Sequence, residues 1–273
     1  MRVCCLGSGS AGNAVLVEVE GTRVLVDAGF SARDLEGRLE EVGLPPDAID
    51  AILITHDHGD HTKGAGVFAR RHGTPVYLTE RTLQACGDVF KGEERIVSFR
   101  IARPFEIGGL RVEPFLTVHD AADPVGIALV DAATGARLGV ATDLGRPTAG
   151  VHHALTGCDF LFLEANHDEV MLRMGPYPWS VKARIASSHG HLSNHASARF
   201  AAALAHPRLA GILLAHLSNE CNEAELARGV VADALAKVGW KGWLEVAHQD
   251  EPTAFLDIEE LRSRCGPDQL TLL

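Results

Sequence analysis

Metal-ligand side chains crowd residues 55–61, which read Thr-His-Asp-His-Gly-Asp-His directly after an apolar run. Three imidazoles and two carboxylates in so short a stretch are difficult to explain by packing, whereas both groups bind zinc, iron and manganese. His56 and His58 are two residues apart and can turn toward one ion, and Asp60 and His61 can turn toward a second. The pattern therefore predicts a metal-holding loop at the end of a β-strand.

Three further candidate ligands, His119, Asp143 and His216, each end an apolar run of strand type. One of them alone is more readily explained as a cap or surface residue, but strand ends gathered at one sheet edge make one pocket. The full set has seven ligands, whereas one tetrahedral zinc uses three or four. We therefore predict two divalent metal ions, with Asp143 able to bridge them. Zinc and manganese both suit the set, and iron does too, because no cysteine belongs to it.

Asp27 follows an apolar run and is predicted to support the 55–61 loop by accepting a hydrogen bond from a ligand imidazole. A simple turn cap is the alternative for this residue. The glycine-rich residues 7–12 match a dinucleotide-binding motif, but an alternating β-type run follows where that motif needs a helix. A tight turn between strands remains, either purely structural or bordering the site. In the second case, the substrate contacts would be Ser8, Ser10 and Asn13.

The segment 163–195 is the second region that predicts chemistry. His191 lies just before a helix that Ser193 or Asn194 would cap, at a position that favours an anion. His191 is the predicted general acid or phosphate contact, His167 is a supporting group, and Asp60 completes the predicted catalytic residues. The predicted substrate contacts of this segment are Lys182, Arg184, Ser193 and Asn194, with Tyr177 and Trp179 able to stack on a base. The alternative is a surface loop packed against its own helix.

The chain alternates strand-type and helix-type segments without a linker, so we expect a single domain spanning residues 1–273. The dipeptide Glu20-Gly21 predicts a hairpin turn. Strands followed by helices, repeated once, favour two packed sheets with helices outside. The expected strands are 2–6, 14–20, 23–26, 51–54, 75–78, 96–98, 110–118, 126–130, 137–141 and 211–215. The expected helices are 32–42, 64–72, 80–86, 193–205 and 223–238.

The net charge of −11 argues against a broad basic surface that wraps nucleic acid, although a local cationic site remains compatible with it. No run of apolar residues is long enough to span a membrane, and no signal peptide is recognisable. The six scattered cysteines contain no CxxC pair, which favours reduced thiols and a cytoplasmic location. The sequence leaves the oligomeric state open.

The HxHxDH motif and the order of His119, Asp143 and His216 resemble the metallo-β-lactamase superfamily. The stretches 6–13, 119–124, 166–168, 190–194 and 216–218 resemble its YycJ/WalJ branch. This resemblance implies an α/β fold of αββα type, two packed mixed β-sheets with helices on the outer faces, and a dinuclear site at one edge. The implied ligand sets are His56, His58 and His119 for one metal, Asp60, His61 and His216 for the other, and Asp143 as a bridge.

The same resemblance implies a metal-dependent hydrolase that cleaves phosphodiesters of DNA from a 5′ end, by attack of a hydroxide held between two metals. A small-molecule hydrolase of the same fold, acting on a thioester, lactone or cyclic phosphodiester, is the first alternative, and the acidic composition favours it. A binding module with purely structural metals is the second. The surplus of ligands over a single tetrahedron argues against that module.

Overall fold

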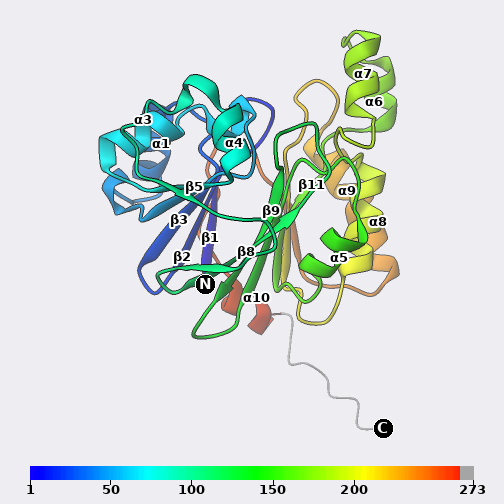
Figure 1. The fold of residues 1–273 in the computed structure, drawn as a ribbon. Helices are drawn as coiled ribbons and strands as arrows, with labels where there is room; N and C mark the ends of the chain where they lie inside the picture. The colour runs from blue at the N-terminus through cyan, green and yellow to red at the C-terminus, as the bar shows by residue number, and fades with distance from the viewer. Residues whose placement is uncertain (265–273) are drawn as a thin grey trace.

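Two seven-stranded mixed sheets pack face to face in the computed structural model, which describes residues 1–264 (Figure 1). The first sheet has the order β14-β1-β2-β3-β4-β5-β6, and the second has the order β13-β12-β11-β10-β9-β8-β7. The strands of the first sheet are β1 Arg2–Gly7, β2 Ala14–Val19, β3 Thr22–Val26, β4 Ala51–Leu53, β5 Val76–Leu78, β6 Ile96–Ser98 and β14 Leu256–Asp257. Those of the second are β7 Phe105–Ile107, β8 Leu110–Leu116, β9 Val125–Asp131, β10 Arg137–Ala141, β11 Phe160–Glu164, β12 Gly211–Ala215 and β13 Trp243–Val246.

Helices cover the outer face of each sheet, so the layers are helix, sheet, sheet and helix (Figure 1). The first sheet is covered by α1 Ala32–Glu41, α3 Ala65–His72 and α4 Glu80–Ala85, and the second by α5 Ala149–Leu155, α8 Asn194–Leu204 and α9 Ala224–Lys237. The remaining helices are α2 Gly59–Thr62, α6 Glu169–Met174, α7 Trp179–Ile185 and α10 Ile258–Arg264, with 3₁₀ turns at Pro46–Ala48 and Gly87–Val89. The predicted αββα architecture is confirmed.

Three apolar clusters hold these layers together. The central one fills the space between the sheets, with side chains such as Val17 and Val26 from the first sheet facing Ile127 and Phe162 from the second. The other two lie between each sheet and its helices. Because β11 and β12 are covered on both faces, every residue in them is buried, which explains their continuous apolar sequences.

The parallel strands bring their carboxyl ends to two facing sheet edges. β3, β4 and β5 run parallel in the first sheet, and β10, β11, β12 and β13 run parallel in the second. Polar residues follow β3, β4, β10 and β12 within one to three positions. Ligands of open α/β sheets gather at such carboxyl ends. The topology therefore places the predicted ligands together.

Most of the expected elements lie within two residues of their predicted ends. Glu20 and Gly21, both with positive φ, form the predicted two-residue hairpin between β2 and β3. The glycine-rich residues 7–12 lead into the strand β2, which confirms that they do not open a nucleotide-binding helix. Residues 59–62 form the helical turn α2 instead of continuing as loop. The elements that the sequence did not reveal are β7, β11, β13, β14, α5, α6, α7 and α10.

The cysteines of the described chain are free and buried at positions 4, 5, 86, 158 and 221, in line with reduced thiols, and Cys265 lies outside the described residues. Across residues 1–264, no helix combines the length and the apolar character that crossing a bilayer requires. The cytoplasmic location and the extent of the single domain stay predictions.

Candidate metal centre

Three histidine side chains from the two sheets form what we call the imidazole cluster. His56 follows β4, His58 lies two residues later, and His119 comes three residues after β8. One ring nitrogen from each lies within 4.8 Å of the others. His119 Nε2 is 3.3 Å from His58 Nδ1, and the ring centroids are 4.7–5.2 Å apart. Three imidazoles at this spacing are a suitable set for one transition-metal ion.

A second group, the mixed cluster, combines a carboxylate with two imidazoles. Asp60 and His61 lie on the helical turn α2, and His216 directly follows β12. Asp60 Oδ2 lies 3.3 Å from His61 Nε2 and 3.3 Å from His216 Nε2. All three ligand atoms therefore point toward one position, and the structure brings together residues that are 156 positions apart in the chain.

The Asp143 carboxylate lies between the two clusters. Its Oδ2 is 3.2 Å from His61 Nε2, and its Oδ1 is 3.6 Å from His119 Nε2. Asp143 also forms a third close group with His56 and His61. One carboxylate can therefore reach a cation in either cluster, as the sequence predicted for a bridging group.

Two buried polar atoms at the centre have no hydrogen-bond partner within residues 1–264: His56 Nε2 and Asp143 Oδ2. Buried polar atoms in proteins are nearly always paired, because an unpaired one loses its hydration without compensation. Both atoms belong to the close ligand groups, where a bound cation would satisfy them. The residues present therefore fit a divalent metal ion on their own chemistry.

Three of the polar residues after strands have left-handed backbone conformations. Asp27, Asp143 and His216 have φ values of +64°, +57° and +57°. Non-glycine residues seldom adopt this region, and those that do gather at functional sites, where the surrounding structure offsets the strain. In each case, the chain has just left a strand and must turn sharply. The strained backbone at these three residues is therefore part of how the fold places their side chains at the centre.

Hydrogen bonds on the far side of each ring fix which nitrogen faces the centre. His61 Nδ1 donates to Asp27 Oδ2 at 2.7 Å, which confirms the predicted contact between Asp27 and the loop. His119 Nδ1 donates to the Gly190 carbonyl at 3.0 Å, and His56 Nδ1 lies 3.0 Å from the Thr55 hydroxyl. In all three histidines, Nε2 is left for a metal, which is the usual arrangement of metal-binding histidines.

Sequence reasoning missed one central group, the buried carboxylate of Glu164 at the end of β11. Its Oε2 accepts from the backbone N–H groups of Leu144 and Leu192 at 2.9 and 3.0 Å. Its Oε1 accepts from Nδ1 of His191 at 2.7 Å and of His216 at 3.1 Å. With four partners it orients two imidazoles and has little capacity left for a metal. The signal was available, because Glu164 ends an apolar run as the recognised ligands do.

The two clusters differ in their electrostatics. Burial lowers the pKa of His56 and of His119, so both rings are neutral ligands. Burial also acts to lower the pKa of His61 and His216, but nearby carboxylates, first among them Asp143, outweigh it. The pKa of His61 is raised well above its usual range, and that of His216 is raised to about 10.

The pKa values of the carboxylates at the centre shift in the opposite direction and are lowered. Burial acts to raise the pKa of Asp60 and Asp143, but the positive charges of His61 and His216 hold both pKa values well below the usual range. The pKa of Glu164 is lowered to about 2, because the charge and hydrogen bond of His191 outweigh its burial. The carboxylates around the mixed cluster thus keep protons on His61 and His216, and a metal ion that displaced those protons would meet the same negative charge.

Comparison with known proteins places this geometry in a family. A model of the beta-lactamase superfamily domain matches residues 22–213. The chain is also 37% identical over 239 residues to the exodeoxyribonuclease YycJ of Bacillus anthracis, covering 86% of this chain and 89% of that protein. The chain belongs to the metallo-β-lactamase superfamily.

A second relative within this superfamily is the exodeoxyribonuclease WalJ of Streptococcus pneumoniae, 36% identical over 238 residues, covering 85% of this chain and 87% of the relative. Among solved structures, the metallo-β-lactamase fold protein YhfI of Bacillus subtilis superimposes with a TM-score of 0.69 at 16% identity, over 92% of this chain and 98% of that protein. The structural likeness supports the fold, and the sequence identity supports the YycJ/WalJ branch that the motifs indicated.

The two predicted catalytic histidines, His191 and His167, differ in their position relative to the proposed metal centre. His191 lies between two ligand rings, with centroids 5.0 Å from His119 and 5.1 Å from His216. Its side chain is 17% exposed, so it borders the solvent as well as the cluster. His167 is buried, its Nδ1 has no hydrogen-bond partner in the described part of the chain, and burial lowers its pKa. It therefore lies behind the centre as a neutral ring.

The glycine-rich turn supports the metal centre from behind. The hydroxyl of Ser8 donates to Asn13 Oδ1 at 2.8 Å and accepts from the backbone N–H of His216 at 2.9 Å. The Asn13 backbone N–H donates to the Asp60 carbonyl at 2.8 Å. Ser8 and Asn13 are both buried, whereas Ser10 is exposed and lines a cavity of about 550 Å³ beside Asp60. Substrate contact by these three residues stays a prediction.

The other predicted substrate contacts are spread over two helices. On α7, Lys182 donates to the Arg173 carbonyl at 2.8 Å, and Arg184 pairs with Asp120 at 2.6 Å. Ser193 caps α8, as predicted. Asn194 is fully buried, and its amide is paired with that of Asn222 in two hydrogen bonds. In this arrangement, Asn194 presents no surface to a substrate.

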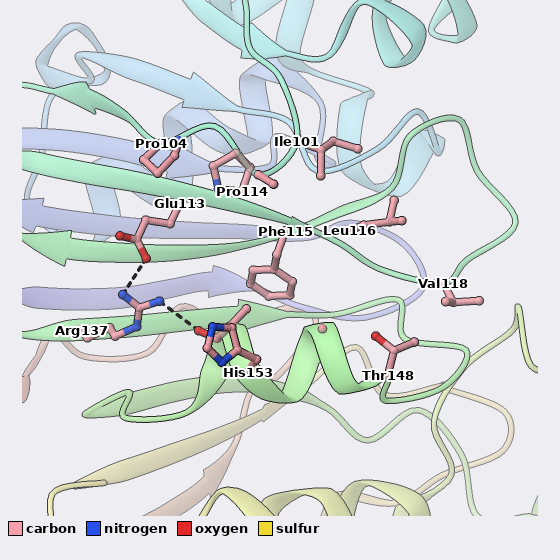
Figure 2. A pocket seen from close by; sticks show the side chains of 13 residues that line it. Ile101, Pro104, Glu113, Pro114, Phe115, Leu116, Val118, Arg137, Thr148 and His153 are labelled. Carbon is pink, nitrogen blue, oxygen red and sulfur yellow. Dashed lines mark hydrogen bonds and ion pairs between the residues drawn. The ribbon is translucent and has the colours of Figure 1, made fainter.

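A cavity of about 530 Å³ lies away from the metal centre, between β8 and α5 (Figure 2). Pro114, Phe115 and Leu116 line it, and Arg137 at its rim pairs with Glu113 at 2.7 Å. It contains none of the predicted ligands or catalytic residues. Its size alone therefore does not make it the site of chemistry.

Proposed function

We propose that this metal-dependent hydrolase is an exodeoxyribonuclease that removes nucleotides from DNA starting at a 5′ end. The observation that carries the proposal is the position of Asp143, whose carboxylate lies within 3.6 Å of ligand atoms in both clusters. A site of this kind is suited to two cations that act on one phosphodiester. The names of YycJ and WalJ, which match this chain over most of their lengths, support the choice of DNA.

In this proposal, each cluster holds one divalent ion and Asp143 lies between them. The proposed ligands are His56, His58 and His119 for one ion and Asp60, His61 and His216 for the other. Two such ions, when bound, supply an activated water and offset the negative charge that builds on the phosphoryl oxygens. Zinc and manganese both suit imidazole and carboxylate ligands, and iron does as well.

The remaining groups hold ligands in place and move a proton. Asp27 orients His61, and Glu164 orients His216 and His191 through the two Nδ1 contacts already described. Because the Nδ1 of His191 is occupied by Glu164, its Nε2 is the atom that can give a proton to the leaving oxygen. His167 supports this region from its buried position behind the centre.

The decisive experiment incubates the purified protein with 5′- and 3′-labelled DNA and RNA, single- and double-stranded, with manganese and with zinc. We expect stepwise shortening of DNA from the 5′ end. Replacing Asp60 with Asn or His61 with Ala is expected to abolish this activity. The matched control is Asp57→Asn, because Asp57 lies in the same motif but its carboxylate accepts from the Ala122 N–H at 2.8 Å and joins neither cluster.

Several outcomes would count against the proposal. Near wild-type turnover by Asp60→Asn would contradict the two-metal site. Hydrolysis of a thioester, lactone or cyclic phosphodiester without any DNA cleavage would favour the small-molecule alternative. DNA binding should also weaken steeply with salt, whereas a small-molecule enzyme should show little such dependence.

A further inference from the structure

Helices α6 and α7 form an arm, residues 169–185, that stands clear of the helical layers above β11 (Figure 1). The arm carries three of the seven exposed large apolar side chains in the described chain. Val170 is 60% exposed, Met174 is 79% exposed and Trp179 is 80% exposed. Exposed apolar side chains gathered on one projection, one of them a tryptophan, indicate an interaction surface.

The charge of the arm is opposite to that of the whole protein. Residues 169–185 contain three basic residues, Arg173, Lys182 and Arg184, and one acidic residue, Glu169, whereas the complete chain has a net charge of −11. Within residues 1–264, the Arg173 side chain forms no ion pair. Arg173 is exposed, so its guanidinium is accessible to an anion. An exposed indole ring on the same arm as cationic side chains matches a partner that has flat bases and phosphates.

The arm is attached directly to the proposed metal centre. The carbonyl of Ile185, at the end of α7, accepts from the His191 N–H at 2.9 Å. Arg184 pairs with Asp120 at 2.6 Å, and Asp120 in turn lies 3.3 Å from the Nε2 of His119. A Cβ at Gly190 would overlap the backbone carbonyls of Arg184 and Ile185, so this contact requires a residue without a side chain. The carboxyl end of α7 is therefore anchored beside the proposed metal centre.

The length of α7 sets how far a bound strand must extend. Trp179 is the first residue of α7 and Ile185 the last, so they are about 9 Å apart along the axis at ~1.5 Å per residue. At a stacked spacing of ~3.4 Å, this corresponds to roughly three nucleotides. A strand that occupies the metal centre must therefore extend by at least about three nucleotides to reach Trp179.

We propose that the arm binds unpaired bases of the DNA strand being cleaved, beyond the nucleotide at the metal centre, with Trp179 stacking on a base and Arg173 contacting a phosphate. This inference rests on the proposed nuclease function and specifies its substrate as single-stranded DNA or a frayed end. Only an unpaired base offers its flat face to a side chain. A tryptophan that points into solvent beside the site is suited to that contact.

The test compares Trp179→Ala, Trp179→Phe and wild type on single-stranded DNA of ten or more nucleotides. Loss of one stacking contact is expected to lower kcat/KM about 5- to 150-fold, mainly through KM, and Phe should restore most of it. The loss should shrink as the oligonucleotide is shortened toward a dinucleotide, which does not reach the arm. Val238→Ala is the matched control, because Val238 is 54% exposed and lies at the end of α9, in the helical layer.

A second variant, Arg173→Ala, tests the charged half of the surface. Removing one phosphate contact should reduce the slope of log K against log salt by about 0.7 for a single strand. Trp179→Ala should leave this slope nearly the same, because stacking releases no counterion. The two variants therefore separate base contact from phosphate contact.

The arm proposal is overturned if wild-type protein degrades DNA while Trp179→Ala matches it at every length. It is also overturned if the loss is the same on a dinucleotide, or if the arm variants change binding to a protein or lipid partner instead. Absence of DNA cleavage by the wild type, with both metals bound, would instead reject the proposed function on which the inference rests.

Discussion

The imidazole cluster and the mixed cluster lie side by side, yet their histidines differ in charge. In the imidazole cluster, burial dominates, and the lowered pKa values of His56 and His119 leave neutral rings ready to bind. In the mixed cluster, nearby carboxylates have the larger effect and raise the pKa values of His61 and His216. Both rings therefore carry a proton that a metal ion would have to displace. The same residue type thus behaves in two ways, according to whether carboxylates or other imidazoles surround it.

The difference implies that the two clusters take up metal by different driving forces. A cation in the mixed cluster is favoured by charge but must displace protons from His61 and His216. A cation in the imidazole cluster displaces few protons and gains its attraction from ring nitrogens and from Asp143. Because the Asp143 carboxylate faces both clusters, its removal should weaken metal binding in both.

The largest effect is therefore expected for Asp143→Asn, which keeps the shape and removes the shared charge. We expect kcat/KM on DNA to fall by at least ~1,000-fold, because metal-ion catalysis is worth several kcal/mol. Metal content measured by mass spectrometry should fall below two ions per chain. A variant that keeps two ions and near wild-type turnover would show that Asp143 does not link the clusters.

The comparison also shows what the sequence can and cannot reveal. The seven predicted ligands could be recognised because residues such as His56, His119 and Asp143 follow an apolar strand, and the topology brings those strand ends together. Glu164 follows the same rule but was overlooked, because residues 160–164 were not among the expected strands. The left-handed backbone at Asp143 and the buried pairing of Asn194 depend on contacts with distant residues, and no local pattern encodes such contacts.

A smaller and one-sided effect is expected for Asp27→Ala. Asp27 contacts His61 directly, in the mixed cluster, and reaches His56 only through the Thr55 hydroxyl. Loss of such a supporting carboxylate typically costs 10–100-fold in metal affinity or activity. Asp27→Asn should recover part of the loss, because its amide oxygen still accepts from His61 Nδ1. The measurement is metal affinity by competition with a chelator, together with kcat/KM. Equal weakening of both ions would contradict the assignment of Asp27 to one cluster.

A last effect concerns the pH dependence of metal binding. Because His61 and His216 have raised pKa values in the metal-free chain, their protonated forms predominate near pH 7 and are stabilised further as pH falls. Metal affinity of the mixed cluster should therefore rise with pH, by about tenfold per unit for each proton released, until pH nears 10, the approximate pKa of His216.

Calorimetry in buffers of different ionisation enthalpy counts the protons released. We expect about two for the ion in the mixed cluster and close to none for the ion in the imidazole cluster. Equal release by the two ions would remove the electrostatic distinction between the clusters, although it would leave their geometry intact.

The most direct test of the two-metal centre is anomalous X-ray diffraction from crystals of the manganese-loaded protein. The proposed site predicts two anomalous peaks, one beside His56, His58 and His119 and one beside Asp60, His61 and His216, with the Asp143 carboxylate between them. A single peak, or density that shows His119 or His216 turned away from the 55–61 loop, would contradict it.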